Sequence, residues 1–139
     1  MQDGTFSSPG FAAVTDLLRG NVYAADCPTR RLLDRIADKW SVLALSLLHE
    51  QPMRFNQLKR AIQGVSQKML SQTLRSLERD GLVSREAVAT VPVSVTYSLT
   101  PLGRSLVAAL LPVVDWAETR MDAVSAAQDR YDARQEAPN

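Results

Sequence analysis

The 139-residue sequence has very little of the chemistry that enzymes and extracellular proteins commonly use. It holds one cysteine, Cys27, which excludes an intramolecular disulfide and a multi-cysteine zinc site. It holds one histidine, His49, and no Ser/His/acid, paired-carboxylate or phosphate-loop pattern, so we expect neither an enzyme nor a cofactor. No apolar run approaches the ~18 residues of a membrane helix, and the first residues lack the basic start of a signal peptide. We therefore expect a cytoplasmic protein with no membrane contact.

The charge of the chain is small in total but unevenly distributed. Apolar residues make up 45% and charged residues 22%, which is typical of one globular domain. The net charge is +1, yet residues 30–104 carry twelve Lys and Arg against six acids, while residues 1–29 and 105–139 are net acidic. A basic middle favours a polyanionic partner, although an uneven solvated surface explains the charge alone equally well.

The first part of the chain predicts a tail and three helices. Residues 1–10 show no periodicity and predict a flexible tail. Residues 11–26 contain a short amphipathic helix, 11–19, which we expect at a dimer contact. Pro28 fits the first position of a helix that runs to about Ala37. The next segment, from Trp40, is apolar almost all round, and its length up to Pro52 favours a buried helix over a strand.

Two further helices follow with a very short connection. Ser66 is a suitable N-cap for the second helix, and Gly81 follows its last turn. Such a Gly-containing connection is the helix-turn-helix pattern, which generic helical hairpins share. The apolar residues that mark the pair lie at spacings of three and four: Phe55, Leu58 and Ile62, then Leu70, Leu74 and Leu77.

A predicted β-hairpin makes the pattern more specific. Residues 82–88 are β-rich, residues 93–99 alternate apolar and polar, and four residues connect them. Thr100-Pro101 then begins a long helix. The fold class we predict is mainly α with a small β-hairpin wing: a winged helix-turn-helix domain over 27–100 with N- and C-terminal dimerisation helices.

The long C-terminal helix carries more apolar surface than packing on one domain requires. We assign it to 101–128, with a kink near Pro112, and expect a flexible tail over 129–139. The extra apolar width indicates contact with another chain.

The second helix of the pair has the composition of a DNA-recognition helix. Arg and Lys can pair with guanine, Gln with adenine, and Ser with a base or phosphate. An ordinary polar helix face is the simpler explanation, but the wing and the basic charge favour DNA. The solvent-facing residues concerned are Gln67, Lys68, Ser71, Gln72, Arg75 and Arg79.

Several motifs in order resemble the HxlR-type winged-helix transcription regulators, relatives of the MarR group. They include Cys27-Pro28, Lys39-Trp40, Arg54-Phe55, Ser66-Gln67-Lys68-Met69-Leu70, Asp80-Gly81-Leu82-Val83 and Tyr97-Ser98-Leu99-Thr100. The resemblance implies a homodimeric bacterial regulator, expected to be a repressor, on a palindromic double-stranded DNA operator. Two departures are Ala37-Asp38, where the family often has a Gly-rich pair, and Ser94, where it usually has a basic residue.

The resemblance also assigns roles to residues. It implies that Gln67, Lys68, Ser71, Gln72 and Arg75 read DNA. The residues expected on phosphates or in the wing contact are Arg54, Ser66, Arg79, Arg85 and Ser94. The residues expected at the dimer interface are Leu17, Leu106, Leu110, Val113, Trp116, Ala117 and Met121.

Cys27 has two interpretations. It precedes the helix that begins at Pro28, and the helix dipole together with Arg30 and Arg31 could favour its thiolate. Some members of the resembled family sense oxidants or electrophiles through a cysteine at this position. A buried structural thiol is the alternative.

Two other functions stay open. The regulator could be induced by a small molecule at the dimer interface rather than by thiol chemistry. A winged-helix module for protein contacts, with no DNA binding, is the competing class, and the weakly basic wing is its best argument.

Overall fold

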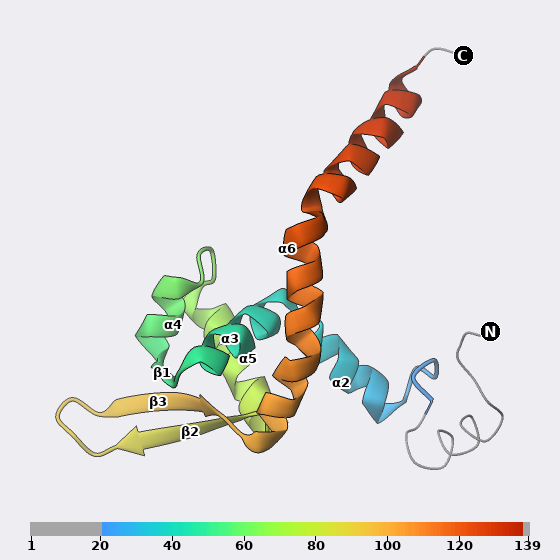
Figure 1. Ribbon diagram of the computed structural model, residues 1–139. Helices are drawn as coiled ribbons and strands as arrows, with labels where there is room; N and C mark the ends of the chain where they lie inside the picture. The colour runs from blue at the N-terminus through green and yellow to red at the C-terminus, as the bar shows by residue number, and fades with distance from the viewer. Residues whose placement is uncertain (1–20, 138–139) are drawn as a thin grey trace.

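The computed structural model describes residues 21–137 of the chain (Figure 1). The predicted tail 1–10, the helix 11–19 with Leu17, and residues 138–139 lie outside the described residues. The described elements are α2 (Pro28–Ile36), α3 (Lys39–Glu50), β1 (Met53–Arg54), α4 (Phe55–Ala61), α5 (Gln67–Arg79), β2 (Val83–Val88), β3 (Ser94–Leu99) and α6 (Pro101–Glu136).

Local capping explains where the helices begin and end. The Ser66 hydroxyl accepts a hydrogen bond of 3.0 Å from the Met69 N–H at the start of α5. The Asp38 carboxylate accepts one from Ser41 at the start of α3. At the end of α5, Gly81 has a φ of 77°, a left-handed conformation that glycine adopts without strain. The predicted N-cap and stop of the second helix are therefore confirmed.

The sheet has three antiparallel strands in the order β1-β3-β2. Strands β2 and β3 form the predicted hairpin, with Val83 opposite Leu99 and Val88 opposite Ser94. The third strand, β1, pairs Met53 with Tyr97 and Arg54 with Thr96. The sequence did not predict β1, because two residues are too short to show an alternating pattern.

The core lies where the helix pair, the base of the hairpin and the first turns of α6 meet. Trp40 is half-buried and packs against this core. The most completely buried side chains are Leu45, Leu58, Leu70, Leu74, Leu77, Val83 and Val107. Three of these leucines are the apolar positions predicted for the second helix, which fixes the polar face of α5 toward solvent.

Helix α6 is one continuous helix of 36 residues, about 54 Å long at 1.5 Å per residue. Pro112 lies inside it without dividing it, and Figure 1 shows that the far half points away from the domain in a different direction from the first half. The flexible tail expected from residue 129 is wrong for 129–136, which are helical. This stretch has neither Pro nor Gly to stop the helix, and the Arg134 guanidinium lies over the Tyr131 ring.

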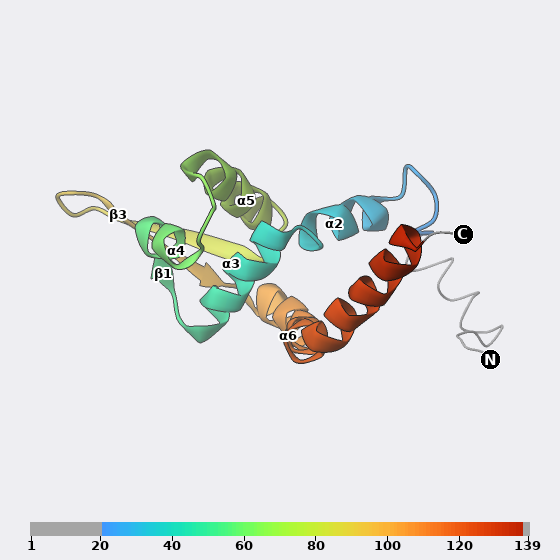
Figure 2. The ribbon, with the colours of Figure 1, turned by 90° about the horizontal axis from the view of Figure 1, so that it is seen from above.

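Two helices, α2 and α6, project from the same side of the domain. Figures 1 and 2 show α2 and the far half of α6 on the side opposite the hairpin. Within the described part of the chain, no helix is both long enough and apolar enough to cross a membrane.

Candidate nucleic-acid interface

Helix α5 presents a polar face on a rigid base. Leu70, Leu74 and Leu77 are essentially inaccessible and hold the helix against α3 and the sheet. On the other side, Gln67, Lys68, Gln72 and Arg75 are exposed and Ser71 is half-buried. The structure therefore makes all five predicted recognition positions accessible from outside, to different degrees.

One flank of α5 forms a groove with the wing. Ser71 and Arg75 line it together with Arg85 from β2, in a cavity of about 400 Å³. Phe55 at the start of α4, Tyr97 of β3 and the exposed Glu78 of α5 also line it. Among residues 21–137, neither Arg75 nor Arg85 forms an ion pair, so both guanidinium groups remain available to an anion.

Gln72 lies on the opposite flank of α5. It lines a different groove with Trp40, Met69 and Ser76, beside the start of α3. The five predicted positions therefore do not form one cluster: Ser71 and Arg75 face the wing, whereas Gln72 faces α3.

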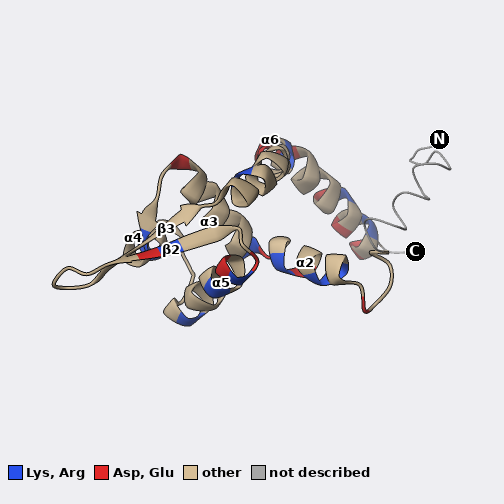
Figure 3. Cartoon of the chain, turned by 90° about the horizontal axis from the view of Figure 1, so that it is seen from below, with Lys and Arg blue, Asp and Glu red and all other residues tan. Residues whose placement is uncertain are grey.

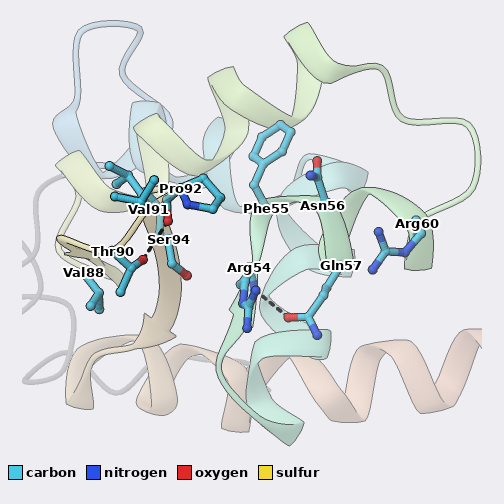
Figure 4. A pocket seen from close by; sticks show the side chains of 12 residues that line it. Arg54, Phe55, Asn56, Gln57, Arg60, Val88, Thr90, Val91, Pro92 and Ser94 are labelled. Atoms are coloured by element: carbon cyan, nitrogen blue, oxygen red, sulfur yellow. Dashed lines mark hydrogen bonds between the residues drawn. The ribbon is translucent and has the colours of Figure 1, made fainter.

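A larger groove of about 930 Å³ lies between α4 and the hairpin (Figure 4). Arg54 and Ser94, both predicted on phosphates, line it from its two sides. The Arg54 N–H donates to Gln57 Oε1 at 2.8 Å, which anchors the start of α4 and leaves the Arg54 guanidinium to the groove.

Sequence reasoning missed two polar residues of this groove. Asn56 and Arg60 are exposed on α4, one turn apart, and both line the groove. The signal was present: removing the apolar positions Phe55, Leu58 and Ile62 leaves them on the solvent face. The first helix of a helix-turn-helix commonly crosses the DNA backbone, which makes such residues phosphate candidates.

Ser66 and Arg79, two of the residues predicted to contact phosphate, make other contacts within the chain. The Ser66 hydroxyl caps α5, and its own proton remains available to donate. Arg79 lies at the far end of α5, 4.0 Å from an Asp80 oxygen, and its side chain is 80% exposed. It is thus a full helix length from Gln67 and Lys68.

The tip of the hairpin carries no charge. Residues 87–99 include neither an acid nor a base, and in Figure 3 the tip of the hairpin is tan throughout, the colour of residues other than Lys, Arg, Asp and Glu. Val91 is fully exposed, and Val88 and Val93 are largely exposed. The wing therefore offers apolar surface at its end and a cation, Arg85, only nearer its base.

Cys27 is the N-cap of α2 and is 5% exposed, although it is not part of the hydrophobic core. The backbone N–H of Arg30 is the largest influence and lowers the pKa of the thiol, with Thr29 acting in the same direction against the effect of burial. We expected the Arg30 and Arg31 guanidinium groups to favour the Cys27 thiolate, but they lie elsewhere. They bind the carbonyl oxygens of Tyr23 and Asp26 instead of the thiol.

The predicted dimer residues divide into two groups. Leu106 and Leu110 are half-buried and pack against the core of their own chain. Val113, Trp116, Ala117 and Met121 are exposed on the part of α6 that projects from the domain. Several large apolar side chains exposed next to one another are typical of an interaction surface.

Metal-binding geometry is not found in residues 21–137, where no three His, Cys, Asp or Glu side chains cluster. His49 lies exposed at the end of α3.

Comparison with known proteins gives consistent matches. The family model described as HxlR-like helix-turn-helix matches residues 35–125. The HTH-type transcriptional regulator YtfH of Escherichia coli is 43% identical over 113 residues, which are 81% of this chain and 90% of YtfH. The solved YtfH structure from Salmonella typhimurium has a TM-score of 0.76 at 39% identity, covering 78% of this chain and 97% of that one.

The structures of two further regulators, each solved in its reduced form, are also similar to this chain. The redox regulator HypR in its reduced form has a TM-score of 0.66 at 36% identity, covering 71% of this chain and 98% of HypR. The reduced form of the Bacillus subtilis transcriptional regulator YodB has a TM-score of 0.58 at 32% identity, covering 66% of this chain and 91% of YodB.

Proposed function

The chain belongs to the HxlR-like helix-turn-helix family of transcriptional regulators, and on that premise we propose that it binds a palindromic DNA operator as a homodimer. As a regulator of this type it is not an enzyme. In the proposed complex each copy places α5 in the major groove of one half-site. Because its target would be chromosomal DNA, we expect it in the cytoplasm.

The observation that carries this proposal is the grouping of Ser71, Arg75 and Arg85 in one groove. An Arg on the recognition helix beside an Arg on the wing can contact a base and an adjacent phosphate together. Lys68, near the N-terminus of α5, is placed where recognition helices contact base edges. Arg54 and Ser94 would follow the backbone from the larger groove.

The experiment is DNA binding by Lys68→Ala and Arg75→Ala across a salt series. DNA fragments are first selected from the native genome with the parent protein. If either residue contacts a base, its variant should lose about 1–3 kcal/mol of affinity for the selected site. If it contacts a phosphate, the salt slope should fall by about 1. Arg130→Ala, which removes the same charge from the far part of α6, is the control and should bind as the parent does.

Two results would contradict the proposal. Binding by both α5 variants that equals the parent's would show that α5 does not read DNA. The absence of any salt-dependent DNA binding by the parent would favour the protein-contact module, for which the uncharged apolar wing tip is the supporting observation.

We propose repression as the mode of action, because a dimer seated on an operator excludes other proteins from it. A reporter gene placed downstream of the selected site should be expressed more strongly when the regulator is deleted. Lower expression after deletion would show activation instead.

We further propose that Cys27 makes the regulator respond to oxidants or electrophiles. Its support is the lowered pKa of the thiol at the start of α2 and the similarity to HypR, described as a redox regulator, and YodB, studied after diamide treatment. A thiolate reacts faster than a thiol. With one cysteine in the sequence, the products available are a disulfide between subunits, a mixed disulfide, a sulfenic acid or an alkylated sulfur.

The Cys27→Ser variant tests the sensor. It should bind the selected operator like the parent but keep the DNA when diamide is added, while the parent releases it. Release by oxidant that persists in Cys27→Ser would reject the thiol sensor and favour a small-molecule inducer at the dimer interface.

A further inference from the structure

An ion pair joins α2 to the end of the candidate recognition helix. Arg35 Nε lies 2.7 Å from Asp80 Oδ2, and its terminal nitrogen lies 2.9 Å from the other carboxylate oxygen. This is the two-bond arrangement in which a guanidinium holds a carboxylate most firmly and in one orientation. The Asp80 side chain is 9% exposed and the Arg35 side chain 36%, so the pair is partly buried.

The pair joins α2 directly to the end of α5, two helices that both also contact α3. Asp80 is the C-cap residue of α5, while Arg35 is on the last turn of α2. Among the residues of α2 none is buried, and Ile36 is the α2 side chain packed against the core. Leu32 and Leu33 are exposed. The direction of α2 relative to α5 depends on this packing of Ile36, on the short connection to α3, and on the Arg35–Asp80 pair, which is the ion pair that joins the two helices within residues 21–137.

We propose that the Arg35–Asp80 pair is a positioning device that fixes α2 relative to α5 and thereby sets the spacing of the two recognition helices in the dimer. This inference rests on the proposed function, since it presupposes a dimer on a two-part operator. The geometry supports it directly: α2 lies on the side of the domain from which the far half of α6 also projects (Figure 2). Neither Arg35 nor Asp80 lines the groove that holds Ser71, Arg75 and Arg85.

The physical reason is that a dimer reads two half-sites at a fixed distance. Half-site spacing is a geometric property of the protein, so an error in the angle between its dimerising part and α5 misplaces one helix in its groove. A partly buried ion pair of this kind adds little net stability compared with apolar residues, but its two hydrogen bonds favour one orientation. Loss of the pair should therefore change which spacing is bound more than it changes the fold.

Other charges near the pair allow a matched control. Asp34 and Asp38 line the same groove as Arg35, but Arg35 forms its ion pair with Asp80. Arg79 also approaches Asp80, at 4.0 Å, from an exposed position on α5 itself. Because Arg79 is itself a predicted phosphate contact, the control is Asp34→Asn, which removes a carboxylate of the same groove without cutting the Arg35–Asp80 link.

The experiment measures affinity for a set of duplexes that differ only in the number of base pairs between the half-sites. The parent should prefer one spacing. Arg35→Met and Asp80→Asn should each reduce that preference about tenfold, the size of coupling that contacting residues show. Affinity for a single half-site should remain that of the parent. Asp34→Asn should keep the parent's profile.

Rescue provides the second readout. The exchange Arg35→Asp with Asp80→Arg should restore part of the spacing preference that each single change loses. Arg35→Lys keeps the charge with only a point donor, so it is the milder variant if the others fold poorly, and it should shift the profile in the same direction.

The outcomes separate the inference from the proposed function. If the parent shows no DNA binding, the proposed function fails. If the parent binds with a preferred spacing and the Arg35 and Asp80 variants keep that preference, the pair serves stability alone and the inference is overturned, even where melting temperature falls.

Discussion

The junction between the wing and α6 depends on glycine at position 103, which has no side chain. Gly103 is buried in the first turn of α6, and a Cβ placed on it would overlap the carbonyl oxygen of Leu82. That carbonyl accepts a hydrogen bond from the Thr100 N–H at 3.1 Å, so it is backbone that cannot easily move away. The close approach therefore requires glycine at this position.

We predict that Gly103→Ala destabilises the protein. Alanine favours a helix over glycine by about 1 kcal/mol, but overpacking against fixed backbone typically costs about 1–3 kcal/mol, so the net effect is a loss. The free energy of unfolding in urea measures it. Arg104→Ala, at the exposed neighbouring position, should differ little from the parent. A Gly103→Ala variant as stable as the parent would mean that α6 can shift away from Leu82 at no cost.

The thiol of Cys27 gives a prediction of pH dependence. N–H groups at the start of α2 lower its pKa, so the thiolate forms at a lower pH in the folded chain than in the unfolded chain. The pairing contributes stability above the unfolded pKa, and this contribution is lost as the pH falls through the lowered value. The rate of alkylation against pH should thus have its midpoint lower in buffer than in concentrated urea, with Cys27→Ser as the unlabelled control. An equal or higher midpoint in the folded protein would contradict it.

At the scale of elements, the wing is the part that departs most from the resembled family. Its tip presents Val91 to solvent without any cation, so we expect the tip to add little to the salt dependence of DNA binding. The contribution of the wing then comes from Arg85 near the hairpin base.

A gain of charge tests the position of the wing tip. If the tip lies beside the DNA backbone, Val91→Lys should tighten binding at low salt and raise the salt slope by about 0.9 for each phosphate contacted. Ala133→Lys adds the same charge to an exposed position in the last part of α6 and should leave the slope unchanged. Equal slopes for both variants would place the wing tip away from DNA.

Most elements could be predicted because their residues carry a period. The alternation in residues 93–99 and the leucine spacing in α5 predicted the hairpin and the helix, and both are confirmed. Strand β1 could not be found, since its two residues are strand only by pairing with β3. The extent of α6 to Glu136 was missed because its last part has no apolar stripe, although nothing in that sequence stops a helix.

The site was less predictable than the fold for a geometric reason. Sequence spacing indicated that Ser71, Gln72 and Arg75 face solvent, but not that they divide between two flanks of α5. The Arg35–Asp80 pair joins residues 45 positions apart, and no local sequence pattern predicts a contact over that separation.

At the scale of the whole molecule, the far half of α6 projects away from the other elements of residues 21–137 (Figure 1). Val113, Trp116 and Met121 are each about half exposed or more, and together with Tyr131 they recur at helical spacing along one side. Leucines 106 and 110, by contrast, pack on the domain. The apolar surface of α6 thus begins as intramolecular core and continues as exposed surface, where we propose that another chain packs.

We predict that Trp116→Glu converts the dimer into monomers. A carboxylate cannot be buried without a partner, so the interface should lose several kcal/mol of association energy while the helix-turn-helix core, which Trp116 does not enter, stays folded. Sedimentation velocity gives the oligomeric state, and circular dichroism checks the fold. The control is Ala126→Glu, which adds the same charge at an exposed position ten residues further along the projecting helix. If Trp116→Glu stays dimeric, association depends on other surfaces, such as α2; if it becomes monomeric, its affinity for the full operator should fall to that for a single half-site, because the second recognition helix is no longer held in register.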